Sequence, residues 1–135
     1  MGEQGSSSGS TATSSLSATM EDFTVLTPLK FLMSNLKSIV NVQLTSDNYA
    51  IWQLQIFKSF SANGFDGYLT GKTTCPTEQN VDYRLWKLID QNLVSALIST
   101  ISPSVLPYII HLSTSSEIWT TLEIRLQPTN RSRVI

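Results

Sequence analysis

The chain has 135 residues, of which 41% are hydrophobic and 14% are charged, and its formal net charge at pH 7 is −1. This length accommodates one domain with tails, and the charged share is low against the ~25% that is typical of globular proteins. The near-neutral charge gives no electrostatic basis for a nucleic-acid-binding face, and the single cysteine, Cys75, excludes an internal disulfide.

The N-terminal stretch is a predicted tail. Residues 1–19 are mainly Gly, Ser, Thr and Ala, with Leu16 as the single leucine. Such a composition buries too little apolar surface to offset the entropy of an ordered chain. We therefore predict a disordered tail over 1–22 and a folded domain over 23–135, with the first folded residues near Phe23.

The first predicted helix starts near Pro28, because proline is favoured in the first turn of a helix. Apolar residues then recur at helical spacing, namely Leu29, Phe31, Leu32, Leu36, Ile39 and Val40. The β-branched end of this run and residues 42–44 are also compatible with an extended strand.

A second helix is predicted over about Asn48 to Ala62. The polar cluster Thr45–Asp47 is expected to cap its start, with the acidic group favouring the positive end of the helix. Asn63-Gly64 is a natural stop, since glycine accepts the left-handed conformation that follows many helices. The expected inner face consists of Tyr49, Trp52, Ile56 and Phe60, widened by Phe57.

Residues 64–80 are predicted to form a loop. Gly67, Gly71 and Pro76 interrupt any continuous helical or strand pattern there. The apolar side chains of this stretch are expected to tuck back onto the core; they are Phe65, Tyr68 and Leu69.

The helix expected after Asp82 is apolar over more than half of its circumference, which predicts a central position in the bundle. Its buried stripe is Trp86, Ile89, Leu93, Leu97 and Ile101, with Leu85, Leu88 and Ile98 alongside. If Trp86 is the core anchor of this helix, its replacement by Ala should cost ~3–5 kcal/mol of stability.

Three helix-start and helix-stop signals predict the structure of the remaining chain. Ser102-Pro103 is expected to end the central helix and to cap a short helix over Val105 to Leu112. Thr114–Glu117 has the capping-box pattern of a helix start. The inner face of that last helix is Trp119, Leu122 and Leu126; Pro128 should end it, and 130–135 resemble the start of a further helix. The prediction is an all-α bundle of four to five helices.

The candidate reactive residues have simpler structural interpretations. His111 and Cys75 lack a visible catalytic partner or ligand set, so we favour a solvated or capping histidine and an inert thiol. Asp90 lies four residues after Trp86 on an apolar helix, and we favour a structural bond to a neighbouring helix end or a Tyr hydroxyl. The glycines of 64–71 lack the spacing of a phosphate loop.

The tryptophans can stack on bases or anchor a partner, but their helical spacing favours core positions over a binding face. The basic residues Arg125, Arg131 and Arg133 are interpreted as a solvated end of the chain. No catalytic, cofactor-binding or metal-ligating residue is therefore predicted, and no small-molecule substrate is expected. No apolar run reaches the length of a membrane span and no secretory signal is visible, which favours a cytoplasmic protein, with the nucleus as the alternative.

With these elements placed, the chain resembles the N-terminal Gag region of plant Ty1/copia-type LTR retrotransposons, from about Pro28 onward. The resembling pieces are Leu44–Tyr49 leading to Trp52, Gly67–Gly71 before Pro76, Trp86 with Asp90, and Ile118-Trp119 with Leu122. Each piece is short, and their joint order and spacing carry the resemblance.

The resemblance implies the amino-terminal part of a helical capsid protein that self-assembles into virus-like particles. It implies fold-defining rather than reactive roles for Asn48, Tyr49, Trp52, Trp86, Asp90 and Trp119. Family members continue through further capsid helices, commonly with a zinc knuckle, and then through protease, integrase and reverse transcriptase. The chain stops at Ile135, so we expect a C-terminally truncated domain from a degenerate or truncated element copy, or from a gene derived from one.

Self-association into a homo-oligomer is the expected partner interaction, and contact with element RNA would require downstream regions. The alternatives are a nucleic-acid-binding or protein-interaction fragment without catalytic activity. The nine basic residues are spread along the chain rather than clustered, which argues against the first of these.

Overall fold

The computed structural model describes residues 26–127, which form an all-α bundle, as predicted. Its elements in chain order are a helix over 26–39, α2 (Tyr49–Ala62), α3 (Asp66–Thr70), α4 (Tyr83–Ser99), the 3₁₀ helix η1 (Leu106–Tyr108) and α5 (Ser115–Leu126). Within 26–127 there is no strand. The predicted tail over 1–22, the fold start near Phe23, the helix stop at Pro128, the 130–135 helix and the pair Arg131 and Arg133 lie outside the described residues.

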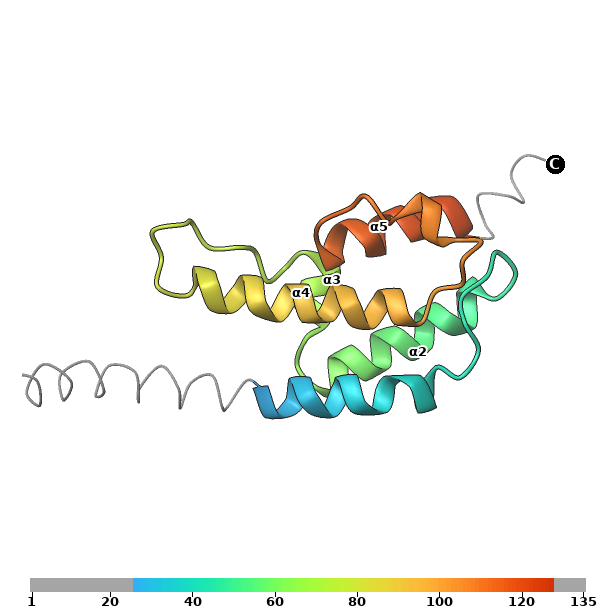
Figure 1. Cartoon of the computed structure of the whole chain (residues 1–135), viewed down its shortest axis with the longest axis horizontal. Coiled ribbons are helices and arrows are strands. Elements are labelled where there is room, and N and C mark those ends of the chain that lie inside the picture. Colours follow the sequence, from blue (N-terminus) through green and yellow to red (C-terminus); the bar gives the residue numbers. More distant parts are fainter. Residues whose placement is uncertain (1–25, 128–135) are drawn as a thin grey trace, which may run out of the picture.

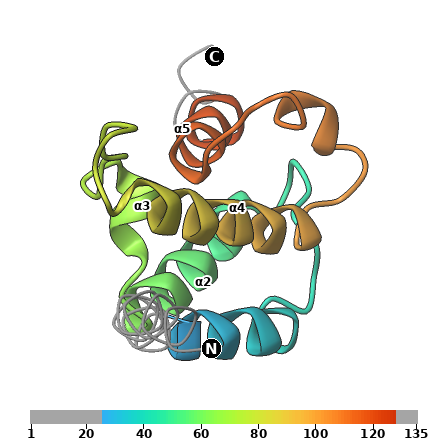
Figure 2. The same cartoon turned by 60° about the vertical axis from the view of Figure 1, so that its left-hand side comes forward.

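Helix α4 occupies the middle of the bundle, as its broad apolar surface predicted. Figures 1 and 2 both show α4 between α5 on one side and α2 with the 26–39 helix on the other. The 26–39 helix and α2 run in roughly opposite directions, and α3 joins α2 to the loop that leads into α4. This arrangement gives α4 apolar partners on two sides, which explains why its stripe is wide.

The 26–39 helix contributes a narrower apolar face than the sequence suggested. Its buried residues are Leu29, Leu32 and Leu36, with Val40 directly after it. Phe31 and Ile39 were predicted on the same face, but their side chains are 61% and 44% exposed. Phe31 lies outside the stripe of residues three and four apart that faces the core, whereas Ile39 has the spacing of that stripe but is the last residue of the helix and remains exposed, so including them was wrong.

The chain between the first two helices is partly extended, which was one of the two alternatives. The Leu44 N–H donates to the Thr100 carbonyl at 2.8 Å and the Ser102 N–H donates to the Leu44 carbonyl at 3.1 Å. These bonds form an isolated parallel bridge between Leu44 and Ile101, both of which are buried. The connection thereby anchors the start of α2 to the end of α4.

The N-terminus of α2 differs from the prediction. Asn48 is its N-cap residue and makes no side-chain capping bond, and Thr45–Asp47 precede the helix. The Asn48 amide instead staples the preceding turn: its Oδ1 accepts from the Thr45 N–H at 2.8 Å and its Nδ2 donates to the Gln43 carbonyl at 3.0 Å. The polar cluster therefore stabilises the entry turn rather than the helix end.

The C-terminus of α2 is the predicted glycine stop. Gly64 has φ of 84°, its N–H donates to the Ser61 carbonyl, and the Phe65 N–H donates to the Phe60 carbonyl at 2.8 Å. These two bonds form a Schellman motif, in which a left-handed residue follows the helix.

Replacing Gly64 by Ala is expected to lower the free energy of unfolding by about 1–2 kcal/mol, because a Cβ disfavours the left-handed conformation. No atom lies within 4 Å of the added Cβ, so the cost is conformational rather than steric. Gly64→Asn is the matched control, since Asn tolerates this conformation and should cost less. Urea unfolding of the three proteins measures the difference; equal losses for Ala and Asn would contradict the interpretation.

Two connections were predicted with the wrong structure. Residues 64–80 were expected to be a loop, but Asp66–Thr70 form the short helix α3, with Tyr68 and Leu69 buried as expected. Residues Val105 to Leu112 were expected to be helical, but only Leu106–Tyr108 form a 3₁₀ turn, with Pro107 inside it. Proline supplies no backbone N–H for a longer helix.

Helix α5 begins with the predicted capping box. The Glu117 N–H donates to Thr114 Oγ1 at 3.1 Å, and the Thr114 N–H donates to Glu117 Oε1 at 3.1 Å. The inner face of the helix buries Ile118 in addition to the three predicted residues, Trp119, Leu122 and Leu126. The N–H groups of Ser113 and Thr114 both donate to the Glu117 carboxylate and thereby lower its pKa.

A candidate binding pocket beside the tryptophan of α4

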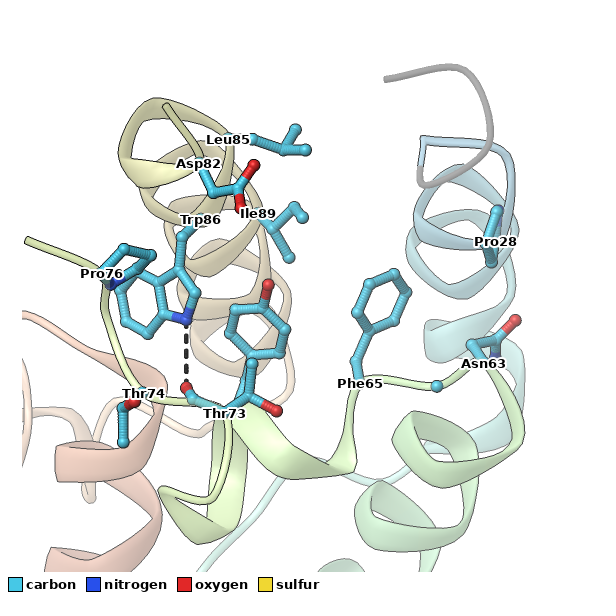
Figure 3. Close-up of a pocket in the computed structure, with 12 residues that line it drawn as sticks. Pro28, Asn63, Phe65, Thr73, Thr74, Pro76, Asp82, Leu85, Trp86 and Ile89 are labelled. Carbon is cyan, nitrogen blue, oxygen red and sulfur yellow. Dashed lines mark hydrogen bonds between the residues drawn. The ribbon is translucent and has the colours of Figure 1, made fainter. Parts of the chain in front are cut away.

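A pocket of about 530 Å³ opens between the N-terminal half of α4 and the start of the 26–39 helix. Figure 3 shows Leu85 and Ile89 projecting from α4 towards this space, with Phe65 between α4 and the helix that carries Pro28. Its lining residues are Pro28, Asn63, Gly64, Phe65, Tyr68, Thr73, Thr74, Pro76, Asp82, Leu85, Trp86 and Ile89. Volumes of ~300–1,000 Å³ are typical of ligand pockets.

The wall of the pocket is assembled from the motif around α3. The indole N–H of Trp86 donates to the Thr73 carbonyl at 3.0 Å, which fixes the loop after α3 to α4. The rings of Tyr68 and Trp86 lie 5.4 Å apart between centroids, at 30°. Aromatic pairs at this separation attract one another beyond their buried area.

The two motif glycines have separate structural reasons. Gly71 ends α3 with φ of 85°, which favours glycine. Gly67 lies against the loop, where an added Cβ would clash with Thr73 Oγ1 and meet the Thr73 N at 3.3 Å. Together they let the loop fold back onto α3 and bring Pro76 to the edge of the pocket.

Trp86 is not the core anchor that its helical spacing predicted. Its side chain is only partly buried and packs against the core cluster from outside. The other residues of the predicted stripe, Ile89, Leu93, Leu97 and Ile101, are buried, while Leu85 and Ile98 are partly buried and Leu88 is 46% exposed. The estimate of 3–5 kcal/mol for Trp86→Ala was therefore based on a wrong placement.

Asp82 is the sole charged residue in the lining, and it is the exposed N-cap residue of α4. Behind the lining, burial together with the charge of Asp90 raises the pKa of Tyr68 to about 12. The pocket thus combines an apolar, aromatic floor with carboxylates on the rim and behind Tyr68.

Trp52 and Trp119 form the aromatic centre of the domain. Trp52 is 1% exposed, its ring centroid lies 5.9 Å from that of Trp119, and its indole N–H donates to Thr100 Oγ1 at 3.0 Å. Tyr49 and Phe57 extend this cluster, with centroids 6.2 Å from Trp52 and 6.3 Å from Trp119, respectively. Burial and the charge of Glu123 raise the pKa of Tyr49 to about 12.

Asp90 is buried and bonds to a helix end, one of the two predicted alternatives. Its Oδ1 accepts from the Ser115 N–H, at the start of α5, at 3.2 Å. The carboxylate therefore satisfies a free backbone donor and lies at the positive end of α5. Asp90 Oδ2 and Ser115 Oγ are buried and make no hydrogen bond in this conformation.

Burial raises the pKa of Asp90 above its ordinary value, and Glu117 adds to that rise. The Ser115 N–H, which donates to the carboxylate, and the charge of Lys87 act in the opposite direction. Desolvation disfavours the charged form of a carboxylate. Burying Asp90 therefore costs free energy, which its hydrogen bond to the Ser115 N–H offsets in part.

The structure separates the other candidate reactive residues. Cys75 is exposed, and its thiol donates to the Pro76 carbonyl at 3.4 Å. His111 is exposed before α5, remote in sequence from Cys75 and Asp90, and the pocket beside Trp86 is lined by none of the three. Among residues 26–127, no group of three or more His, Cys, Asp or Glu side chains could hold a metal ion.

The remaining motif residues divide between these groups. Pro76 and Trp86 line the pocket, and Gly67 and Gly71 belong to the α3 segment that forms its wall. Tyr49, Trp52, Trp119 and Leu122 lie in the core, and Asn48 and Asp90 make the two polar contacts described above. Sequence reasoning missed the pocket because its floor and rim come from four separate segments. Asp82 and Pro28 were recognised only as helix starts.

The chain is similar to two retrovirus-related Pol polyproteins of Arabidopsis thaliana. It is 36% identical over 106 residues to the one from transposon RE1, covering 67% of the chain and 7% of that protein. It is 32% identical over 114 residues to the one from transposon RE2, covering 78% of the chain and 8% of that protein. The chain thus spans less than a tenth of these relatives, and with this identity and coverage it belongs to the family of retrovirus-related polyproteins of copia-type transposons.

No family model matches the chain, and no solved structure matches it. In the part of the chain that the structure describes, no helix is long and apolar enough to cross a membrane.

Proposed function

We propose that this relative of retrotransposon polyproteins is a Gag-type structural module, whose function is helical self-association as part of a capsid-like assembly. The observation that carries the proposal is the combination of an all-α domain with similarity to polyproteins of which it spans 7% and 8%. A segment of that size corresponds to one structural unit of a much longer product, and the motif order of Trp52, Trp86 and Trp119 resembles that of the copia-type Gag region, which supports the proposal.

Helix α2 offers a surface for pairing with a second copy. Ile51 and Leu54 lie three residues apart on its outer face and are 57% and 47% exposed. Exposed apolar side chains that neighbour one another are typical of association surfaces. The opposite face of α2 is occupied by the core, so pairing through Ile51 and Leu54 would leave the fold intact.

Light scattering of the purified chain across a range of concentrations, with and without RNA, tests the proposal. We expect the mean mass to rise with concentration in the absence of RNA. The double variant Ile51→Lys/Leu54→Lys should shift this rise to at least about tenfold higher concentration, because buried charge opposes pairing. Phe31→Lys is the matched control, since Phe31 is also exposed but lies on the 26–39 helix.

Three outcomes separate the alternatives. A monomer at all concentrations, indifferent to RNA, would overturn self-association for this chain. A mass that grows only with RNA and falls steeply with salt would instead support the nucleic-acid-binding alternative. Equal effects of the α2 variant and the Phe31 variant would leave self-association in place but exclude α2 as its surface.

A further inference from the structure

We propose that the pocket beside Trp86 binds a lysine or arginine side chain, with its apolar neighbours, from an extended segment of a protein partner. The inference rests on the chemistry of the lining and does not require self-association. It goes beyond the assembly role because it assigns a separate site and a separate class of ligand.

The apolar part of the pocket suits the stem of a basic side chain. Phe65 and Ile89 form a floor in which each residue is 4% exposed, and Leu85 and Pro28 flank it while remaining partly exposed. Lysine and arginine pack their methylene stems along such surfaces while the charged head stays near water. A floor of this kind therefore accepts the stem without burying the charge.

The charged group of the bound lysine or arginine would lie near a carboxylate and aromatic ring faces, with no cationic side chain in the lining to repel it. Asp82 supplies the carboxylate at the rim, and no Lys, Arg or His lines the pocket. The adjacent rings of Tyr68 and Trp86 add the electron-rich faces that attract cations. Burial, with the charge of Asp90 as a smaller cause, raises the pKa of Tyr68 to about 12, so this ring stays a neutral phenol at pH 7.

The volume argues for more than a single side chain. About 530 Å³ exceeds the space that one basic side chain fills, so apolar residues on either side of it would also be accommodated. An RNA strand is a poorer fit, because Asp82 repels phosphate and the Trp86 indole N–H is already bonded to Thr73. The charge of the rim thus selects a basic peptide over a nucleic acid.

Nuclear magnetic resonance of the full chain tests the proposal through the three indole N–H signals. The probe is the capped tripeptide acetyl-Leu-Arg-Leu-amide, and Trp86→Phe assigns the Trp86 signal by its loss. We expect the probe to shift the Trp86 signal, while the signal of Trp52, which is bonded to Thr100 inside the core, stays in place. The matching peptide with Gln in place of Arg should bind at least about fivefold more weakly, because the cation is lost.

Asp82→Asn should weaken binding of the arginine peptide by about three- to tenfold. This substitution keeps a residue type that is favoured at a helix start, so it should leave the fold intact. Asp47→Asn is the matched control, because Asp47 is also an exposed carboxylate next to a helix start but does not line the pocket. An unchanged dispersion of amide signals verifies that each variant is folded.

The proposal is overturned if the arginine and glutamine peptides bind equally well, or if Asp82→Asn and Asp47→Asn have the same effect. A hexauridylate probe that shifts the Trp86 signal at lower concentration than the arginine peptide would also overturn it, in favour of RNA. These readouts are independent of light scattering, so failure of the pocket and failure of self-association are distinguishable.

Discussion

Replacing Trp52 by Ala is expected to lower the free energy of unfolding by about 3–5 kcal/mol, enough to unfold much of a marginally stable domain. Trp52 is 1% exposed and lies against Trp119, so its removal leaves a cavity that the helices cannot fill. It also removes the donor that reaches Thr100 at 3.0 Å. Urea unfolding followed by far-ultraviolet circular dichroism measures the loss.

Two further variants separate the contributions. Trp52→Phe keeps an aromatic ring but loses the N–H, and is expected to cost about 1–3 kcal/mol. Trp86→Ala should cost only about 1–2 kcal/mol, because that ring is partly exposed at the pocket. A loss for Trp86→Ala as large as that for Trp52→Ala would show that Trp86 is a core anchor after all.

Replacing Asp90 by Ala is expected to lower the free energy of unfolding by about 1–3 kcal/mol relative to Asp90→Asn. Alanine removes the acceptor of the Ser115 N–H, which is buried at the start of α5. Asparagine keeps a carbonyl oxygen for this bond and offers an N–H₂ group to Ser115 Oγ, which has no bond at present. Chemical denaturation of the two variants at pH 7 gives the difference. Equal stabilities would show that the hydrogen bond from the Ser115 N–H to residue 90 does not stabilise the fold.

The pH dependence of the same proteins tests the charge of Asp90. Its pKa is raised in the fold by burial, so the folded state binds a proton more tightly than the unfolded state. The stability that this proton contributes is present below the unfolded pKa, which is about 4, and is lost as the pH rises through the folded value. The stability of Asp90→Asn relative to the natural chain should therefore increase from about pH 4 upward.

Glu117 provides an opposite control. Its pKa is lowered by the N–H groups of Ser113 and Thr114, so its contribution is present above its unfolded pKa and is lost as the pH falls. Glu117→Gln should thus flatten the acid side of the stability curve, whereas Asp90→Asn should steepen it. A change of the same sign in both variants would show that the two carboxylates do not differ as the structure indicates.

The all-α class, the positions of the long helices and much of the core could be predicted from the amino-acid sequence. These features depend on local spacing: Trp52 and Phe60 share a face of α2 because residues three and four apart coincide on a helix. The glycine after α2 and the capping box of α5 are equally local, since both satisfy backbone groups within a few residues.

Which apolar residues are covered, and which of them line a site, depends on how the helices pack against one another. Trp86 and Leu93 share the predicted stripe of α4. Leu93 is fully buried in the core, whereas Trp86 is only partly buried and lines a pocket. Periodicity specifies the direction of a side chain around its helix axis but not what packs against it. The partner of Asp90 was likewise decided by where the start of α5 came to lie, 25 residues further along the chain.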